Sequence, residues 1–382
     1  MRVRNLTAAV AVTGMLLATT ACGGGASSSG EVTVGAVLTL TGVGADFGQA
    51  QRAALEMGVA DEEKKTGTKV NLVVEDSGES NTVALSALSS VLSKRPAIVY
   101  GPFLGTQVLA MTPKVEQAKV PLLVTSGTKS ITEGAATSQI FRWYASTALS
   151  EPATAAYLDA KLHIKAAAIL YDTTAYGQDG LGLVRGQLEK DGVKVLTTQA
   201  VNPTDTDVSG QVHSILATKP DAIFVQLIGG ASGAVALKAL TAQGNHAPVI
   251  WGSGITSHSL LDLIDDQDVN GVYGNQLKVI TAQTAKGEIG DFLQRYKKKT
   301  NREGDAFALA AYDAGRFIVQ SVADGVDTPQ KWDEHLKSTT YKGLLATYHD
   351  DGDGNMVNET TILQMHNKVP VPIDVVNGAP AK

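Results

Sequence analysis

Cysteine is almost absent from this chain: its 382 residues include one, Cys22. A single thiol excludes an intramolecular disulfide, so packing has to hold the fold together. Long apolar runs are also scarce. Residues 6–21 are apolar or small and carry no charge, and no later stretch approaches the ~20 apolar residues of a membrane-spanning helix. Beyond this first segment the sequence therefore predicts no transmembrane helix.

Basic residues are too few for a nucleic-acid surface. The chain has 32 basic and 38 acidic residues, and no basic block is interleaved with aromatic side chains. The short run at 297–299 is typical of the solvated end of a helix. Without Arg2 and Arg4, which precede the apolar segment, 30 basic residues face 38 acidic ones, a net charge of −8. We therefore expect no nucleic-acid partner.

Catalytic and metal-binding patterns are missing as well. The seven histidines are scattered without metal-ligand spacing, and no G-x-S-x-G nucleophile turn occurs. The segment 350–355 (DDGDGN) is similar to a calcium loop, but Met356 and Ile362 stand where that loop needs glycine and glutamate. We predict that the chain is not an enzyme and needs no metal and no cofactor. For 350–355 we predict a solvated hairpin turn.

Three glycines, Gly42, Gly44 and Gly48, follow the first predicted strand and precede a helix. A dinucleotide fingerprint would place its third glycine one position earlier, with an acid ~20 residues further on at a strand end, and neither is present. The glycines therefore indicate either a loop whose backbone amides approach a ligand or a tight turn. The sequence leaves both open.

The surroundings of Cys22 account for its position. A short basic region, an apolar run and small residues precede it, which is the layout of a secretory signal. A cysteine directly after such a signal resembles that of bacterial lipoproteins, although Thr19 stands where their pattern prefers leucine. The resemblance implies a signal peptide at 1–21 and a diacylated Cys22 followed by a flexible Gly/Ser tether, together 22–31. The alternative is a secreted protein with an incidental thiol.

From residue 32 onward, short apolar runs alternate with amphipathic stretches in two series. The predicted strands are 32–40, 69–76, 97–101 and 120–127, and then 166–172, 193–201, 221–230 and 248–254. Strand–helix repetition with continuously apolar strands predicts parallel sheets covered on both faces. The fold class is therefore α/β, with two doubly wound parallel-sheet lobes, followed by helices at 287–300 and 306–324 and a terminal hairpin.

Small polar residues gather at the carboxyl ends of the predicted strands. In open parallel sheets ligands bind at these ends, where loops and helix N-termini offer backbone N–H groups. Two such segments precede helices, so Gly105, Thr106, Gly127 and Thr128 are placed to bind a carboxylate. The alternative for Thr106 is a helix N-cap.

Five segments together resemble the type I periplasmic solute-binding proteins of ABC transporters, in the branched-chain amino acid class. They are GAVLTLTGVGADFG, VYGPFLGTQVLAMTPKVEQAKVPLLVTSGT, ILYDTTAYGQDGLGLVRGQLEKDGVKV, PDAIFVQLIGGASGAVALKALTAQG and FALAAYDAGRFIVQSV. The resemblance implies a hinge of three crossovers, near Trp143, Lys278 and Thr347, about which two lobes close on a ligand. The implied boundaries are 32–143 plus 279–346 for one lobe and 144–278 plus 347–376 for the other.

The resemblance also implies the binding residues. The family's clamp on an α-carboxylate and α-ammonium falls on Gly105, Thr106, Gly127 and Thr128, and its further contacts fall on Phe47, Tyr176, Ile228, Gly229 and Ser253. Three contacts depart from the family, because Gly105 replaces a serine, Gly254 replaces an acid that pairs the ligand ammonium, and Ile228 or Gly229 replaces a residue that is usually aromatic. A buried ammonium without a counter-charge costs several kcal/mol, unless Asp172 or a main-chain carbonyl compensates.

These features predict an extracytoplasmic, membrane-anchored, monomeric substrate-binding lipoprotein of an ABC importer. It would deliver a small carboxylate-bearing solute, a branched-chain or aliphatic amino acid or a related acid, to permease and ATPase subunits. The alternatives are the same fold binding an aromatic acid or other solute, and a ligand sensor for a membrane signalling partner.

Overall fold

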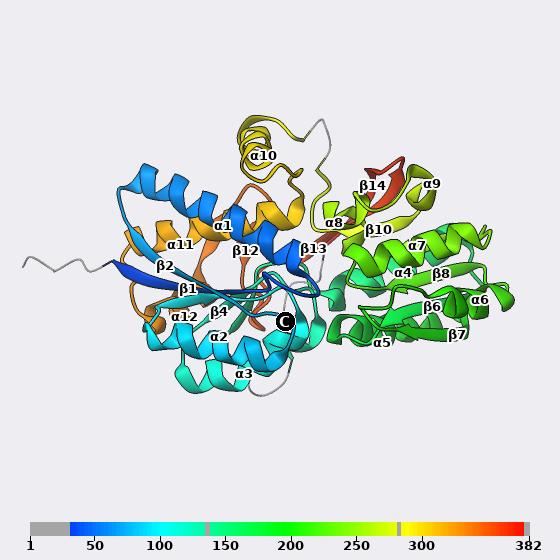
Figure 1. Cartoon of the computed structure of the whole chain (residues 1–382), viewed down its shortest axis with the longest axis horizontal. Coiled ribbons are helices and arrows are strands. Elements are labelled where there is room, and N and C mark those ends of the chain that lie inside the picture. The colour runs from blue at the N-terminus through cyan, green and yellow to red at the C-terminus, as the bar shows by residue number, and fades with distance from the viewer. Residues whose placement is uncertain (1–30, 134–137, 281–283, 378–382) are drawn as a thin grey trace, which may run out of the picture. The chain divides into compact units, whose positions relative to one another are not determined.

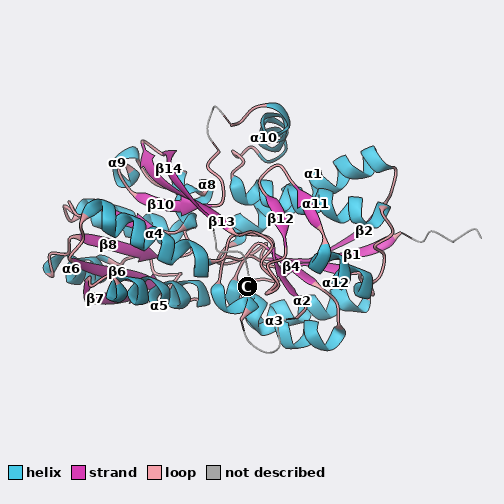
Figure 2. Ribbon diagram, turned by 180° about the vertical axis from the view of Figure 1, so that it is seen from behind, coloured by secondary structure: helices cyan, strands magenta, loops and turns pink. Residues whose placement is uncertain are grey.

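The computed structural model describes residues 31–133, 138–280 and 284–377. The predicted signal peptide, Cys22 and nearly all of the tether lie outside these ranges. Within them, no helix combines the length and apolar character needed to cross a membrane. Two main sheets carry the fold, each with helices on both faces (Figures 1 and 2).

The first sheet has five parallel strands in the order β2-β1-β3-β4-β5. They are β1 (Val32–Leu38), β2 (Val70–Asp76), β3 (Ile98–Tyr100), β4 (Leu122–Val124) and β5 (Ile140–Arg142). The connecting helices are α1 (Ala45–Thr66), α2 (Asn81–Ser93), α3 (Gly105–Ala118) and the 3₁₀ turn η1 (Lys129–Thr132). We call this sheet, with the helices that cover it, lobe 1.

The second sheet has seven strands in the order β14-β13-β10-β9-β8-β6-β7. Its parallel part consists of β6 (Ala166–Asp172), β7 (Lys194–Val201), β8 (Ala222–Gln226), β9 (Val249–Trp251) and β10 (Tyr273–Gln276). The antiparallel hairpin β13 (Glu359–His366) and β14 (Val369–Asn377) extends it. Its helices are α4 (Thr147–Leu162), α5 (Ala175–Lys190), α6 (Ser209–Ala217), α7 (Gly230–Ala242), η2 (Ser253–Thr256), α8 (His258–Leu261) and α9 (Asp266–Val269). We call this sheet, with its helices, lobe 2.

The parallel parts of the two sheets share one topology, because the orders 2-1-3-4-5 and 7-6-8-9-10 differ only in numbering. In each, the first strand is followed by an edge strand, and the chain then returns to the other side of the first strand. The order therefore reverses between β1 and β3 and between β6 and β8. Loops at such reversal points diverge and leave a crevice at the carboxyl ends of the strands.

Lobe 1 is completed by segments from late in the chain. They are α10 (Gly287–Thr300), α11 (Ala306–Ala323), α12 (Pro329–Ser338) and the strand pair β11 (Thr340–Lys342) and β12 (Thr347–His349). Helix α11 lies beside α1 on one face of the sheet, and α2 and α3 cover the other (Figure 1).

The segment 350–355 forms a hairpin-like turn, as predicted, because the backbone N–H of His349 donates to the carbonyl of Met356 (2.8 Å) and that of Asp351 donates to the carbonyl of Asn355 (3.1 Å). The turn does not connect β12 to β13, since β12 pairs with β11. It contacts β5 instead: the backbone N–H of Arg142 donates to Gly354 (2.7 Å), and that of Met356 donates to Arg142 (2.9 Å). Moreover, Tyr348 and Met356 pack in the core of lobe 1. We therefore propose that the third crossover lies near residue 358 rather than at Thr347, and we keep the other two near Trp143 and Lys278.

The glycine-rich loop after β1 is a tight turn. Gly42 and Gly44 have φ angles of 77° and 86°, in the region that favours glycine. The N–H of Ala45, the first residue of α1, donates to the Gly42 carbonyl (3.1 Å). Of the two readings that the sequence leaves open, the structure favours the turn.

Candidate binding site

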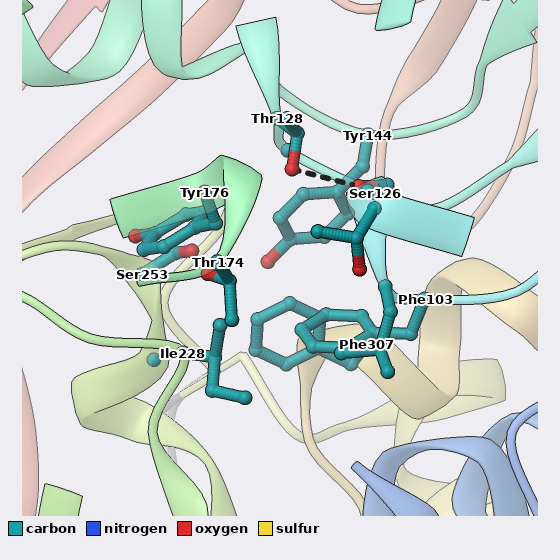
Figure 3. Close-up of a pocket in the computed structure, with 14 residues that line it drawn as sticks. Phe103, Ser126, Thr128, Tyr144, Thr174, Tyr176, Ile228, Ser253 and Phe307 are labelled. Atoms are coloured by element: carbon teal, nitrogen blue, oxygen red, sulfur yellow. Dashed lines mark hydrogen bonds between the residues drawn. The ribbon is translucent and has the colours of Figure 1, made fainter. Parts of the chain in front are cut away.

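A cavity lies where loops from both lobes meet. The loops after β3 and β4 contribute from lobe 1, and those after β6, β8 and β9 from lobe 2 (Figure 3). Seven of the nine predicted contact residues line it: Gly105, Thr106, Gly127, Thr128, Tyr176, Ile228 and Ser253.

The other two predicted residues lie beside the cavity. Phe47 and Gly229 line a neighbouring hollow that shares Ile228 with it. The ring of Phe47 stacks on that of Phe103, with centroids 4.3 Å apart, and it is Phe103 that lines the cavity. Phe47 therefore supports the wall from behind.

Sequence reasoning missed six lining residues: Phe103, Leu104, Ser126, Tyr144, Thr174 and Phe307. A seventh, Gly254, was named only as the position where the family has an acid. Phe103, Leu104 and Ser126 belong to the same strand-end loops as the predicted clamp, so their position in the chain was a usable signal. Phe307 is the second residue of α11, far along the chain, and no local sequence pattern indicates that it contributes to this site.

One end of the cavity offers hydrogen-bond donors. Helix α3 begins at Gly105, and its N-cap residue Leu104 provides no side-chain cap, so the first N–H groups of the helix remain available. Thr106 lies inside the first turn and is not the N-cap. The hydroxyls of Ser126 and Thr128 lie 3.2 Å apart beside this terminus. A helix N-terminus with adjacent hydroxyls binds an anion through N–H groups and the helix dipole.

Space explains why glycine occupies position 105. A Cβ there would overlap Thr128 Oγ1 and lie 2.5 Å from Thr128 Cβ and 2.8 Å from its Cγ2. Thr128 is buried, and its carbonyl accepts a hydrogen bond from Arg142 (2.7 Å), so it cannot easily move away. Thr128 thus fills the space that a side chain at 105 would need.

The remaining walls are mainly apolar and aromatic. The ring of Phe307 stacks on Tyr144, with centroids 4.9 Å apart, and meets Phe103 edge-on at 5.8 Å. Ile228 and the ring of Tyr176 face them from lobe 2 (Figure 3). These surfaces suit a branched or cyclic hydrocarbon body.

The Tyr176 ring belongs to the cavity, whereas its hydroxyl is buried in lobe 2. That hydroxyl forms no hydrogen bond with any described residue, although Ser253 lies close enough to lower its pKa. Burial raises the pKa of Tyr176 well above its usual value, and the nearby charges of Glu151 and Asp172 raise it further. The ring also faces lobe 1, because its Cε2 lies 3.9 Å from where a Cβ on Gly127 would be.

No charged side chain lines this cavity in the part of the chain that the structure describes. Asp172 lies behind the wall, where its carboxylate accepts from the N–H groups of Thr174 (3.0 Å) and Ile228 (2.9 Å). Glu151 is buried too and accepts from Gln226 (2.9 Å) and Asn275 (3.2 Å). Burial raises the pKa of both carboxyl groups, and these hydrogen bonds oppose the rise.

Gly254 has no side chain at the position where the family resemblance implies an acid that pairs the ammonium group of a ligand. A Cβ there would lie 3.3 Å from the carbonyl oxygen of Ile228, so even a small side chain is crowded. The described ranges contain no group of three or more histidine, cysteine, aspartate or glutamate side chains that could hold a metal ion.

Comparison with known proteins identifies the family. Residues 31–369 match the family model described as "Periplasmic binding protein". The chain belongs to the periplasmic binding protein family. This is a family of extracytoplasmic proteins that bind solutes. Among curated relatives, Leu/Ile/Val-binding protein homolog 3 of Brucella melitensis is 24% identical over 294 residues, which cover 75% of this chain and 77% of the relative.

Solved structures of other family members agree with the fold. The substrate-binding protein LivJ of Streptococcus pneumoniae, in complex with isoleucine, has a TM-score of 0.81 at 19% identity and covers 91% of this chain and 100% of its own. A solute-binding protein of Rhodopseudomonas palustris, in complex with benzoate, has a TM-score of 0.81 at 17% identity, with 92% and 98% covered. The predicted two-lobed type I periplasmic binding protein fold is confirmed.

Proposed function

We propose that this protein is the substrate-binding component of an ABC importer and that its solute is a small carboxylic acid with a branched or cyclic apolar body and no ammonium group. The observation that carries the proposal is the cavity itself. It presents helix N–H groups and hydroxyls at one end and aromatic walls elsewhere, and none of the described residues that line it has a charged side chain. Delivery to a permease is supported by family membership.

The absence of a lining acid separates the two solute classes. A carboxylate can be held by N–H and hydroxyl donors alone, whereas an ammonium buried without a counter-charge costs several kcal/mol. Asp172 is occupied by the backbone of its own lobe, and Gly254 supplies no side chain. A benzoate complex of similar fold supports the ring-bearing class, and the isoleucine complex supports the alternative.

Matched pairs of solutes test this choice directly. Isocaproate is leucine without its ammonium, and hydrocinnamate is phenylalanine without its ammonium. We expect each acid, measured by titration calorimetry, to bind at least about tenfold more tightly than its amino acid, a difference of ~1.4 kcal/mol or more. Benzoate completes the set.

Thermal shift provides a second measure on the same protein, because a true ligand at ~100 times its Kd adds ~2.7 kcal/mol of stability. If leucine or phenylalanine binds more tightly than its deaminated partner, the proposed solute class is wrong. If none of the five compounds binds, the carboxylate assignment itself fails.

The membrane anchor is a separate part of the proposal. Cys22, at the end of an apolar segment and before a Gly/Ser tract, is expected to carry lipid. In cells that process lipoproteins, Cys22→Ser should move the protein from the detergent phase to the aqueous phase of a phase-partition assay. Ser27→Ala, a matched change within the tether, should leave partitioning unchanged. Identical partitioning of the wild type and Cys22→Ser would exclude lipidation.

A further inference from the structure

Arg142, the last residue of β5, is a buried cation whose hydrogen bonds go to neutral groups. Its side chain is 0% exposed. It donates to the carbonyls of Gly127 (2.6 Å), Thr128 (2.7 Å) and Lys129 (3.1 Å). Its other donors reach Asn355 Oδ1 (2.9 Å) and Thr132 Oγ1 (2.8 Å). No carboxylate of the described chain hydrogen-bonds to it.

These contacts fix the segment of lobe 1 that lines the cavity. We call residues 126–129 the ligand loop, because Ser126, Gly127 and Thr128 all line the cavity. The guanidinium binds three successive carbonyls of this loop, those of Gly127, Thr128 and Lys129. A buried charge with fixed, planar donors holds backbone more precisely than neutral contacts do.

Lobe 2 places a carboxylate next to the ligand loop. Asp179, on α5 of lobe 2, accepts a hydrogen bond from the N–H of Ser130 (2.9 Å), the residue that follows the ligand loop. Burial lowers the pKa of Arg142 to about 9, and the negative charges of Asp179, Asp351 and Glu133 oppose that change. Arg142 is therefore still a cation at neutral pH.

Of these three acids, Asp179 alone belongs to lobe 2. Asp351 already accepts from the N–H groups of Asp353 (2.9 Å) and Asn355 (3.1 Å), and Glu133 pairs with Lys129 (3.0 Å). Both remain beside Arg142 whatever lobe 2 does. The charge of Asp179 reaches Arg142 only while α5 lies against the ligand loop.

We propose that Arg142 is the positioning residue of the ligand loop and that Asp179 docks beside it when the lobes close, so that the two set solute affinity without touching solute. A buried cation gains from an added counter-charge, and this gain exists only in the closed form. Any interaction confined to the closed form shifts the population toward it and raises the affinity for whatever the closed cavity binds. The effect on affinity rests on the proposed function, whereas the docking does not.

Two variants separate charge from hydrogen bonding. Asp179→Asn removes the charge and keeps an acceptor, whereas Asp179→Ala removes both. The matched control is Glu189→Gln on the same helix, where the exposed side chain contacts no partner among the described residues. Without solute, Asp179→Ala should increase the radius of gyration measured by small-angle scattering and speed hydrogen exchange at the Ser130 amide. Asp179→Asn should show smaller changes of the same sign, and Glu189→Gln none.

Affinity is then measured with isocaproate. We expect the affinity to fall about threefold in Asp179→Asn and about tenfold in Asp179→Ala, mainly through faster dissociation. The melting temperature without ligand should be the same as that of the control Glu189→Gln. If the wild type does not bind isocaproate, the proposed solute class fails and the solute-free measurements still decide the docking. Unchanged scattering and unchanged Ser130 exchange in both Asp179 variants would overturn the proposal.

Coupling between the two residues is tested in a double-mutant cycle. Arg142→Lys keeps a charge but cannot supply the same fork of donors. In that background Asp179→Ala should cost less affinity than it does in the wild type, because the ligand loop beside which Asp179 docks is no longer held by the full fork of donors. Additive losses would show that Asp179 acts independently of Arg142. If Arg142→Lys does not fold, the Asp179 variants alone decide the matter.

Discussion

Gly105→Ala should weaken solute binding by about tenfold or more, because it overfills the donor end of the cavity. Three atoms of Thr128 crowd the position of the new Cβ, so rotation of one side chain cannot relieve the overlap. The backbone of Thr128 would have to move against its hydrogen bond from Arg142. Overpacking of this kind costs ~1–3 kcal/mol. Calorimetry with the tightest of the matched acids measures the loss.

Two further variants show that space is the cause. Gly182→Ala on α5 has no atom within 4 Å of its new Cβ and should leave affinity unchanged. The exchange Gly105→Ser with Thr128→Gly moves the hydroxyl to the other side of the same gap and should recover part of the affinity lost by Gly105→Ser alone. Equal affinity of Gly105→Ala and the wild type would remove the steric argument.

Much of the fold could be predicted because its signals are local. Continuously apolar strands such as Val32–Leu38 and Ala166–Asp172 are buried between two helical layers, and their neighbours along the chain pair with them. The pairing of the segments between α12 and β13 was harder to predict from the sequence. The pairing of β12 with β11, and the contact of residues 354–356 with Arg142, join segments that sequence periodicity does not relate.

The candidate site divides in the same way. Strand ends that precede helices pointed to Gly105 and Thr128, which meet at the donor end of the cavity. Phe307 was missed because it comes from the start of a helix more than a hundred residues further along the chain. Phe47 was predicted as a contact, but Phe103 takes the place beside the cavity and Phe47 stacks on it. Which of two stacked rings faces a ligand depends on packing that a sequence does not record.

The Tyr176 ring is the other feature expected to have a large effect. It forms part of the lobe 2 wall and faces Gly127 of lobe 1, so its contact with solute requires both lobes (Figure 3). Tyr176→Ala should therefore weaken binding by ~1–3 kcal/mol, mainly through faster dissociation, with little change in the ligand-free melting temperature. Stopped-flow and calorimetry on the same preparation separate the two quantities.

Tyr176→Phe distinguishes the ring from its hydroxyl. The hydroxyl is buried beside Glu151 without a hydrogen-bond partner among the described residues, so its removal should leave ligand-free stability unchanged or slightly higher. Affinity should also stay close to the wild-type value, because the ring that covers the solute remains. If Tyr176 is instead a core residue of lobe 2, Tyr176→Ala will lower the ligand-free melting temperature by several degrees and leave the dissociation rate nearly unchanged. That result would assign the closure contact on this wall to Ile228, whose side chain faces the same cavity.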